Sequence, residues 1–310
     1  MITHYFSTVR SRKLQILDAH KAGSWCHVVN PTKSDVEYLV EVFGLDQDIL
    51  TDATDIYEAP RVETDDKATY VFTRYCHPDG DNTSTEPLLV VYTDSNIVTI
   101  MRTQDKVLDN LINGSVDILT TQKTKTFLHI LEEINRSYRV QLNLVSKQIL
   151  KFRSELRLAE ITSDQIVRFI EIEEDLNEFL AALQPQALVL TALESGKYMR
   201  LYDDDRDMVE DIMLGTSELI ELSKSRVRTV ANIRQAYDVI ATNNLNRTFR
   251  RLTSIAIFLT IPTIIGGLFG MNVELPFNNE GDPANFWFVL GLILVSMISF
   301  ISVFKYKRWI

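Results

Sequence analysis

Asn272 is the residue whose type and position most suggest ion chemistry in this chain. It follows Gly270 and Met271 at the end of a stretch, from Leu252 to Val273, that carries no charged residue. The Asn272 amide oxygen is a neutral ligand, and Gly270 allows the backbone to turn and present carbonyl groups at the same level. Neutral oxygens suit contact with a divalent cation that keeps its water shell. The alternative is an ordinary helix C-cap, where Asn is favoured, and the two roles are compatible.

Two apolar stretches near the C-terminal end are long enough to cross a bilayer. The first is Leu252 to Val273 and the second is Pro283 to Phe304, and about 18 apolar residues suffice for a membrane helix. Basic residues flank the pair, at Arg247, Arg250, Arg251, Lys305, Lys307 and Arg308. The connection has only acidic charges, at Glu274, Glu280 and Asp282. Because short basic flanks stay in the cytoplasm, we expect both termini inside and the connection outside.

Composition narrows the function of the large N-terminal part, which we expect to be cytoplasmic. The 310 residues carry a net charge of −10, which argues against nucleic acid as a partner. The two cysteines, Cys26 and Cys76, are too few for a disulfide framework and are expected to be buried. The five histidines show no metal-ligand spacing, and no nucleotide-binding or nucleophile motif is present, so an enzyme is not expected.

Residues 1–118 are expected to form a cytoplasmic α/β domain. Short β-branched and aromatic runs bounded by turn residues predict strands, and a turn at Asn30-Pro31 predicts a helix that Gly44 closes. The acidic segment 77–87 is expected to be a loop. The expected strands cover 14–17, 25–29, 70–75 and 88–101, the last with a hairpin turn at 94–96.

From residue 119 onward, apolar residues recur at helical spacing, as at Val230, Ile233 and Tyr237. This pattern predicts helices near 120–153, 163–195 and 203–269, the last running into the first apolar stretch. A helix of about 65 residues is on the order of 100 Å long, so we expect a stalk supported by copies of itself. The expected segments are a helical layer (119–202), the stalk (203–249), a first span (250–272), an extracellular connection (273–285), a second span (286–304) and a basic cytoplasmic tail (305–310).

The first span carries small and hydroxyl residues that favour an oligomer. Two helices cannot enclose an aqueous path, but several copies in a ring can, with the polar face of the first span inward. The residues concerned are Thr260, Thr263, Gly266, Gly267 and Gly270. The alternative is that small residues merely let helices pack closely.

The region from Arg251 to Ile310 resembles the membrane end of the CorA family of magnesium and divalent-cation channels. The residues that carry the resemblance are Gly270-Met271-Asn272, which match the family's signature, and a basic, Trp-containing C-terminus at 305–309. The order of α/β domain, helical layer, stalk helix and two spans is also similar. The resemblance implies an α+β membrane protein that forms a funnel-shaped homopentamer in the cell membrane, with the first span lining a central pore.

The same resemblance implies residue roles. Gly270, Met271 and Asn272 would form the selectivity filter for a hydrated ion, and Leu252 would form an apolar gate. The pore-facing stripe would consist of Asn246, Leu252, Thr260, Thr263 and Gly267, and the acidic connection (Glu274, Glu280 and Asp282) would attract cations to the mouth. The implied activity is passive uptake of Mg²⁺, with Co²⁺ and Ni²⁺ as further candidate ions.

The resemblance further implies regulation by intracellular Mg²⁺ bound between subunits. By position, Asp211 matches the stalk carboxylate of that sensor. Its partner would come from the 77–87 segment, with Asp79, Asp81 and Glu86 as candidates. The alternative for the acidic run at 203–211 is a solvated helix face.

Some features depart from the family pattern. Phe269 stands where many members have Tyr before the signature, and 273–277 differs from the connection of some members. One alternative is a zinc transporter of the ZntB type, although such relatives usually lack the Met that Met271 provides here. Another is a two-span anchored binding or signalling protein with a dimeric stalk, which subunit number would distinguish from a pentamer.

Overall fold

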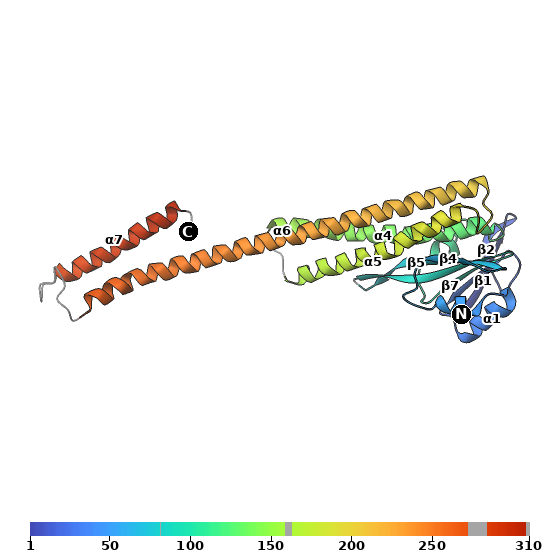
Figure 1. The fold of residues 1–310 in the computed structure, drawn as a ribbon, viewed down its shortest axis with the longest axis horizontal. Coiled ribbons are helices and arrows are strands. Elements are labelled where there is room, and N and C mark those ends of the chain that lie inside the picture. The colour runs from blue at the N-terminus through green and yellow to red at the C-terminus, as the bar shows by residue number, and fades with distance from the viewer. Residues whose placement is uncertain (81, 159–162, 272–283, 308–310) are drawn as a thin grey trace. The chain divides into compact units, whose positions relative to one another are not determined.

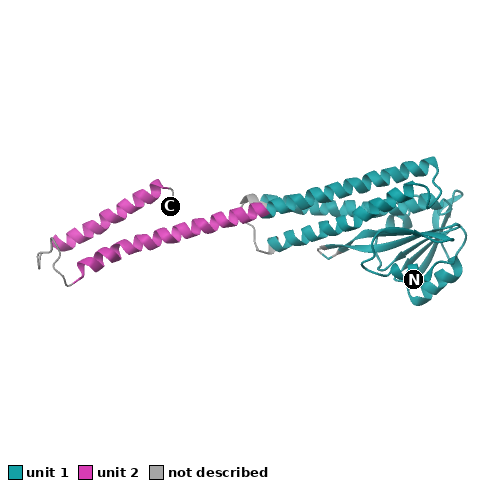
Figure 2. Cartoon of the chain, in the orientation of Figure 1, with its two compact units in different colours: residues 1–234 teal, residues 235–310 magenta. Residues whose placement is uncertain are grey.

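The computed structural model describes residues 1–80, 82–158, 163–271 and 284–307. The chain divides into two compact units, residues 1–234 and residues 235–310 (Figure 2).

A seven-stranded mixed sheet organises the first unit, with the strand order β2-β1-β3-β7-β6-β5-β4 (Figure 1). The β3–β7 pair is parallel and every other pair is antiparallel. The strands are β1 (Ile2–Thr8), β2 (Ser11–Leu17), β3 (Trp25–Val29), β4 (Arg61–Thr64), β5 (Ala68–Asp79), β6 (Asn82–Thr93) and β7 (Ile97–Met101).

Both faces of the sheet are covered. Successive side chains of a strand point to opposite sides, so each strand contributes to both faces. On β3, Trp25 belongs to one core cluster and Cys26 to the other. The Cys26 cluster packs against α1 (Lys33–Phe43) and α2 (Gln47–Asp52). The Trp25 cluster includes residues of α3 (Asp109–Ile112), α4 (Lys123–Leu158), α5 (Ser163–Glu194) and α6 (Asp203–Phe269).

The helix expected after Asn30-Pro31 is α1, and its two ends explain its limits. The Thr32 hydroxyl accepts from the Asp35 backbone N–H, and the Asp35 carboxylate accepts from the Thr32 backbone N–H, which completes a capping box. Gly44 ends the helix with a φ of 68°, in the left-handed region that glycine adopts at little cost. The prediction for this segment is confirmed.

The prediction of a loop at 77–87 is wrong. β5 and β6 pair continuously through this segment, with His77 opposite Ser84 and Tyr75 opposite Glu86. Thr83 and Thr85 alternate inward along β6, and the Thr85 N–H and hydroxyl both donate to Glu178 of α5. Threonine favours strands, and these bonds satisfy its polar groups, so a polar composition did not prevent strand formation. The strands β1 and β4 were also not predicted.

The helical half of the chain agrees with the sequence pattern. α4, α5 and α6 have the expected order and nearly the expected limits, and α7 (Ala284–Tyr306) contains the predicted second span. α6 is one continuous helix although Pro262 lies inside it, and it runs from the first unit into the second. Cys26 and Cys76 are both buried, as expected. α4 and α5 share one core with the sheet, so they belong to the same compact unit.

Candidate functional site

The second unit contains two helical segments with the length and composition of membrane spans, one at the end of α6 and one in α7. Within the described chain, large apolar side chains on both helices are exposed, among them Leu252 at 57% and Leu259 at 62%. An exposed apolar surface of this kind marks contact with lipid or with other protein. The two helices therefore have the surface of membrane spans.

The candidate pore-facing residues of α6 are all exposed within the chain. Thr260 donates its hydroxyl proton to the Ala256 carbonyl at 2.7 Å, and Thr263 donates to the Leu259 carbonyl at 3.0 Å. Because each hydroxyl donates its one proton to a backbone carbonyl of its own helix, its oxygen acts toward other groups as an acceptor. The structure thus leaves a neutral oxygen at each of these two positions. The other members of the predicted stripe are Asn246, Leu252 and Gly267, which are also exposed.

The end of α6 is tightened around Gly270. The Gly270 N–H donates to the Gly266 carbonyl at 2.9 Å, and the Met271 N–H donates to the Leu268 carbonyl at 3.4 Å. A Cβ at position 270 would lie 3.1 Å from the Gly266 carbonyl oxygen, which is closer than ordinary contact. The local geometry therefore favours glycine at position 270. The third signature residue, Asn272, lies outside the described residues, as do Glu274, Glu280 and Asp282.

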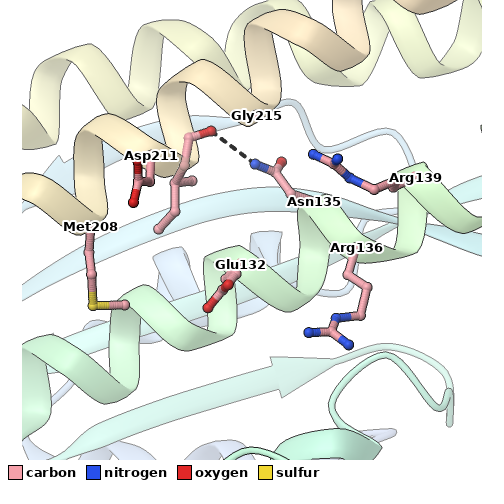
Figure 3. Close-up of a pocket in the computed structure, with 8 residues that line it drawn as sticks. Glu132, Asn135, Arg136, Arg139, Met208, Asp211 and Gly215 are labelled. Atoms are coloured by element: carbon pink, nitrogen blue, oxygen red, sulfur yellow. Dashed lines mark hydrogen bonds between the residues drawn. The ribbon is translucent and has the colours of Figure 1, made fainter.

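Asp211, the predicted stalk carboxylate, lies at a pocket of about 400 Å³ between α6 and α4 (Figure 3). Its side chain is exposed, and Glu132 of α4 lines the same pocket. Two guanidinium groups lie beside them, and Arg139 pairs with Glu218 at 3.2 Å. Asp211 has no ion-pair partner within the described ranges. The pocket is lined by Glu132, Asn135, Arg136, Arg139, Met208, Asp211, Ile212 and Gly215.

Of the proposed partners of Asp211, the structure describes only the side chain of Glu86, and Glu86 does not line the Asp211 pocket. Glu86 is buried and accepts two bonds from Arg102, at 2.7 and 3.0 Å, and it lines a different pocket. Asp81 lies outside the described residues, and so does the side chain of Asp79. Among the described residues, no group of three or more His, Cys, Asp or Glu side chains is arranged to hold a metal ion.

Sequence reasoning missed Asp175 and Glu178 on α5. Burial raises the pKa of Asp175 to about 6, the Thr83 N–H lowers it, and the nearby carboxylates of Glu178 and Glu171 raise it further. The Glu178 carboxylate accepts hydrogen bonds from the Thr85 N–H and hydroxyl. In the sequence these residues belong to an acidic helical run that is indistinguishable from a solvated face, so only the packing of α5 on β6 reveals them.

A large sheet-and-helix unit, one helix that continues into an apolar segment and a second apolar helix together define a two-span integral membrane protein. The Gly-Met pair at the end of the first span narrows this class further. The model of the family described as "CorA-like Mg2+ transporter protein" matches residues 20–308, and the chain belongs to this family. It is a family of membrane ion transporters and not of enzymes.

Individual relatives agree with this assignment over almost the whole chain. The cobalt/magnesium transport protein CorA of Methanocaldococcus jannaschii is 26% identical over 296 residues, covering 92% of this chain and 91% of that protein. The protein of the same name from Thermotoga maritima is 20% identical, covering 93% and 83%. The complete structure of the Methanocaldococcus jannaschii CorA magnesium transporter has a TM-score of 0.86 at 22% identity, covering 100% of this chain and 99% of that one. The fold, with its mixed sheet, long helix and two apolar helices, is therefore that of a full-length CorA protein.

Proposed function

We propose that this chain forms a homopentameric channel through which Mg²⁺, and also Co²⁺, enters the cell passively. The observation that carries the proposal is α6. One helix begins with carboxylates at Asp203, continues into an exposed apolar span and ends at the Gly270-Met271 turn of the family signature. Cobalt is included because two relatives are named cobalt/magnesium transport proteins.

The proposed selectivity filter is a ring of Gly270, Met271 and Asn272 from each copy. Mg²⁺ loses its waters reluctantly, so neutral oxygens that contact the hydrated ion select it without trapping it. The absence of Asp and Glu from the sequence of both spans supports contact of this kind. At the mouth, Glu274, Glu280 and Asp282 would raise the local cation concentration.

Inward from the filter, the proposed pore is lined by neutral groups and then narrows at an apolar ring. Thr260 and Thr263 would present hydroxyl oxygens as acceptors, because their protons are donated within the helix. Gly267 would leave room for water, because it has no side chain and no neighbouring side chain of the described residues lies near it. Leu252 is exposed within the chain and follows three basic residues, so a ring of five would form a hydrophobic constriction that closes by dewetting. Asn246 would continue the path on the cytoplasmic side.

The energy for uptake would come from the membrane potential. The basic flanks of the spans support cytoplasmic termini and an external connection. With the interior negative, a divalent ion gains about 4.6 kcal/mol per 100 mV on entry, because each elementary charge gains about 2.3 kcal/mol. No chemical energy source is then needed.

For regulation, we propose that intracellular Mg²⁺ bridges carboxylates of neighbouring copies and holds the channel closed. Asp211 is exposed and free of ion pairs within the described part of the chain, which leaves its charge available to a cation. Asp79 and Asp81 are the preferred partners from a neighbouring copy, because Glu86 is already neutralised by Arg102. Like charges at an interface repel until a cation joins them, so the ion would bias a two-state assembly.

The test is Mg²⁺ uptake into proteoliposomes under an inside-negative potential, with wild type compared with Asn272→Ala. Asn278→Ala in the same connection is the matched control, since it removes an equivalent amide outside the signature. Loss of uptake in Asn272→Ala alone, with an intact pentamer, is the expected result. Equal flux in all three proteins would remove Asn272 from the filter.

The same preparations test the alternatives. Zn²⁺ flux without Mg²⁺ flux would establish a zinc transporter of this architecture. A dimer without flux of either ion would establish an anchored binding protein.

A further inference from the structure

The first unit contains a second cavity, of about 950 Å³, that the transport path does not use. It lies at the carboxyl ends of β3 and β7, the one parallel pair of the sheet, and is bordered by β1 and α3. In open α/β sheets, ligands bind in the crevice outside the carboxyl ends of the parallel strands, and this cavity has the corresponding position at the one parallel pair. Its volume is in the range of small-molecule sites.

A buried histidine presents a hydrogen-bond donor to this cavity. His27 is 8% exposed, and its Nδ1 lies 2.8 Å from the Thr99 hydroxyl oxygen. That oxygen also accepts the Trp25 indole N–H at 2.9 Å, and an indole can only donate. The Thr99 hydroxyl can donate its own proton to His27 Nδ1, and in that tautomer the histidine proton is on Nε2. Nε2 has no hydrogen-bond partner among the described residues.

A second buried polar group opens into the same space. Tyr5 is 9% exposed, and its ring lies 5.2 Å from that of Trp25 and 6.4 Å from that of His27. Its hydroxyl has no partner in the part of the chain that the structure describes. Two mostly buried side chains thus bring polar atoms without a partner among the described residues to one cavity, where a ligand can hydrogen-bond to both.

Four charged groups line the cavity. The Met1 ammonium pairs with Asp35 and Asp105 contacts His77, which leaves Arg102 and Asp109 to define what the ligand carries. Arg102 lines it and donates to Glu86 through Nε and Nη2, and its Nη1 makes no hydrogen bond within the described ranges. Asp109, the first residue of α3, lies close enough to Tyr5 that its charge raises the pKa of the Tyr5 hydroxyl, after the larger effect of burial. Asp109 has no ion pair or side-chain hydrogen bond within the described ranges.

We propose that this cavity binds a small zwitterion of the amino-acid class. Its carboxylate would accept from Tyr5, His27 and Arg102, three residues with donor groups that line one cavity, and its ammonium group would pair with Asp109. The near balance of positive and negative side chains around the cavity disfavours polyanions such as nucleotides. The site would be independent of the ion path, because all its residues belong to the first unit.

The experiment is equilibrium dialysis of radiolabelled L-alanine, L-glutamine and L-leucine against the detergent-solubilised full-length protein. Propionate and ethylamine, which each keep one of alanine's two charged groups, are the ligand controls. We expect saturable binding of at least one amino acid, and at least tenfold weaker binding of both controls, because each lacks one charge-assisted contact.

Two variants keep the volume of the site and remove one contact each. Tyr5→Phe and Asp109→Asn are expected to weaken binding about tenfold or more while the thermal unfolding temperature stays near that of wild type. Tyr57→Phe and Asp117→Asn, which change exposed residues elsewhere on the same unit, should bind as wild type does. Absence of saturable binding for all three amino acids would overturn the proposal, and so would binding that neither Tyr5→Phe nor Asp109→Asn weakens. Neither result depends on Mg²⁺ flux.

Discussion

The Asn135 side-chain amide of α4 donates to the Ile212 backbone carbonyl of α6 at 3.0 Å (Figure 3). The same amide donates to the Thr216 hydroxyl oxygen at 2.9 Å, and its carbonyl oxygen lies 3.1 Å from that hydroxyl. All three groups are buried. This polar contact joins α6, the helix that continues into the first apolar span, to α4, which packs on the sheet.

Replacing Asn135 with Ala should destabilise the first unit. The change leaves the Ile212 carbonyl and the Thr216 hydroxyl with fewer partners in a buried place, which costs about 1–3 kcal/mol. Asn143→Ala is the matched control, because Asn143 is on the same helix but is exposed. Chemical denaturation followed by circular dichroism measures the difference. Equal midpoints for the two variants would show that the contact contributes nothing to stability.

Stability should also depend on pH through His27. Burial lowers the pKa of His27 to about 4, whereas an unfolded His titrates near pH 6.5. Between these values the unfolded chain binds more protons than the folded one, so stability rises with pH across the window. The contribution of neutral His27 is complete above about pH 6.5 and is lost as the pH falls toward 4, at up to about 1.4 kcal/mol per unit.

The measurement is the free energy of unfolding at a series of pH values for wild type and His27→Gln. Glutamine has no proton to bind in this range, so the slope between pH 4 and 6.5 should be smaller in the variant. Asp175 has the opposite sign, because its folded pKa of about 6 lies above its ordinary value. Because Asp175 offsets part of the wild-type slope, the decisive quantity is the difference in slope between wild type and His27→Gln. Parallel curves would contradict the assignment of His27.

Gly270 should tolerate a side chain less well than Gly266. A Cβ at position 270 would lie 3.1 Å from the Gly266 carbonyl oxygen, so Gly270→Ala requires a local adjustment of the backbone at the end of α6. Gly266→Ala is the control, because a Cβ at 266 meets no atom within 4 Å in the described chain. We expect Gly270→Ala to reduce Mg²⁺ flux at least tenfold with the oligomer intact, and Gly266→Ala to retain most of it. Lower flux in Gly266→Ala than in Gly270→Ala would contradict this prediction.

The parts of the fold that the sequence predicted are those governed by local pattern. α4, α5 and α6 follow a sustained helical period, and the two spans follow from uncharged length. The 77–87 part of the β5–β6 hairpin was missed because its buried positions include threonines, whose burial depends on Glu178 from a helix distant in sequence. For the candidate site, the predicted stripe could be proposed without knowledge of tertiary packing because all its residues lie on one helix, α6. The surroundings of Asp211 could not, because they depend on how α4 packs against α6. Tertiary packing, and not local preference, decides such positions.

Leu252 is predicted to hold the pore shut by its apolar surface. Leu252→Ser would lower the cost of wetting the constriction, so Mg²⁺ should leak through the closed channel several-fold faster at high internal Mg²⁺. Ile257→Ser is the control, since Ile257 is also exposed but lies about 140° around the same helix. Flux is measured in proteoliposomes loaded with a saturating Mg²⁺ concentration. A leak of equal size in both variants would indicate general loosening of the helix packing and no specific gate.

Asp211 is predicted to sense internal Mg²⁺ through its charge. Asp211→Asn keeps the size of the side chain but removes the anion that a bridging cation needs, so inhibition of flux by internal Mg²⁺ should require a several-fold higher concentration. Glu210→Gln is the sharpest control, because it removes one charge per copy from the adjacent, exposed residue, about 100° around the same helix. A general electrostatic effect would shift both inhibition curves equally, whereas a site at Asp211 shifts only one. Unchanged inhibition in Asp211→Asn would assign the sensor to other carboxylates, and Asp175 on α5 would be the next to test, because a bound cation would lower its raised pKa.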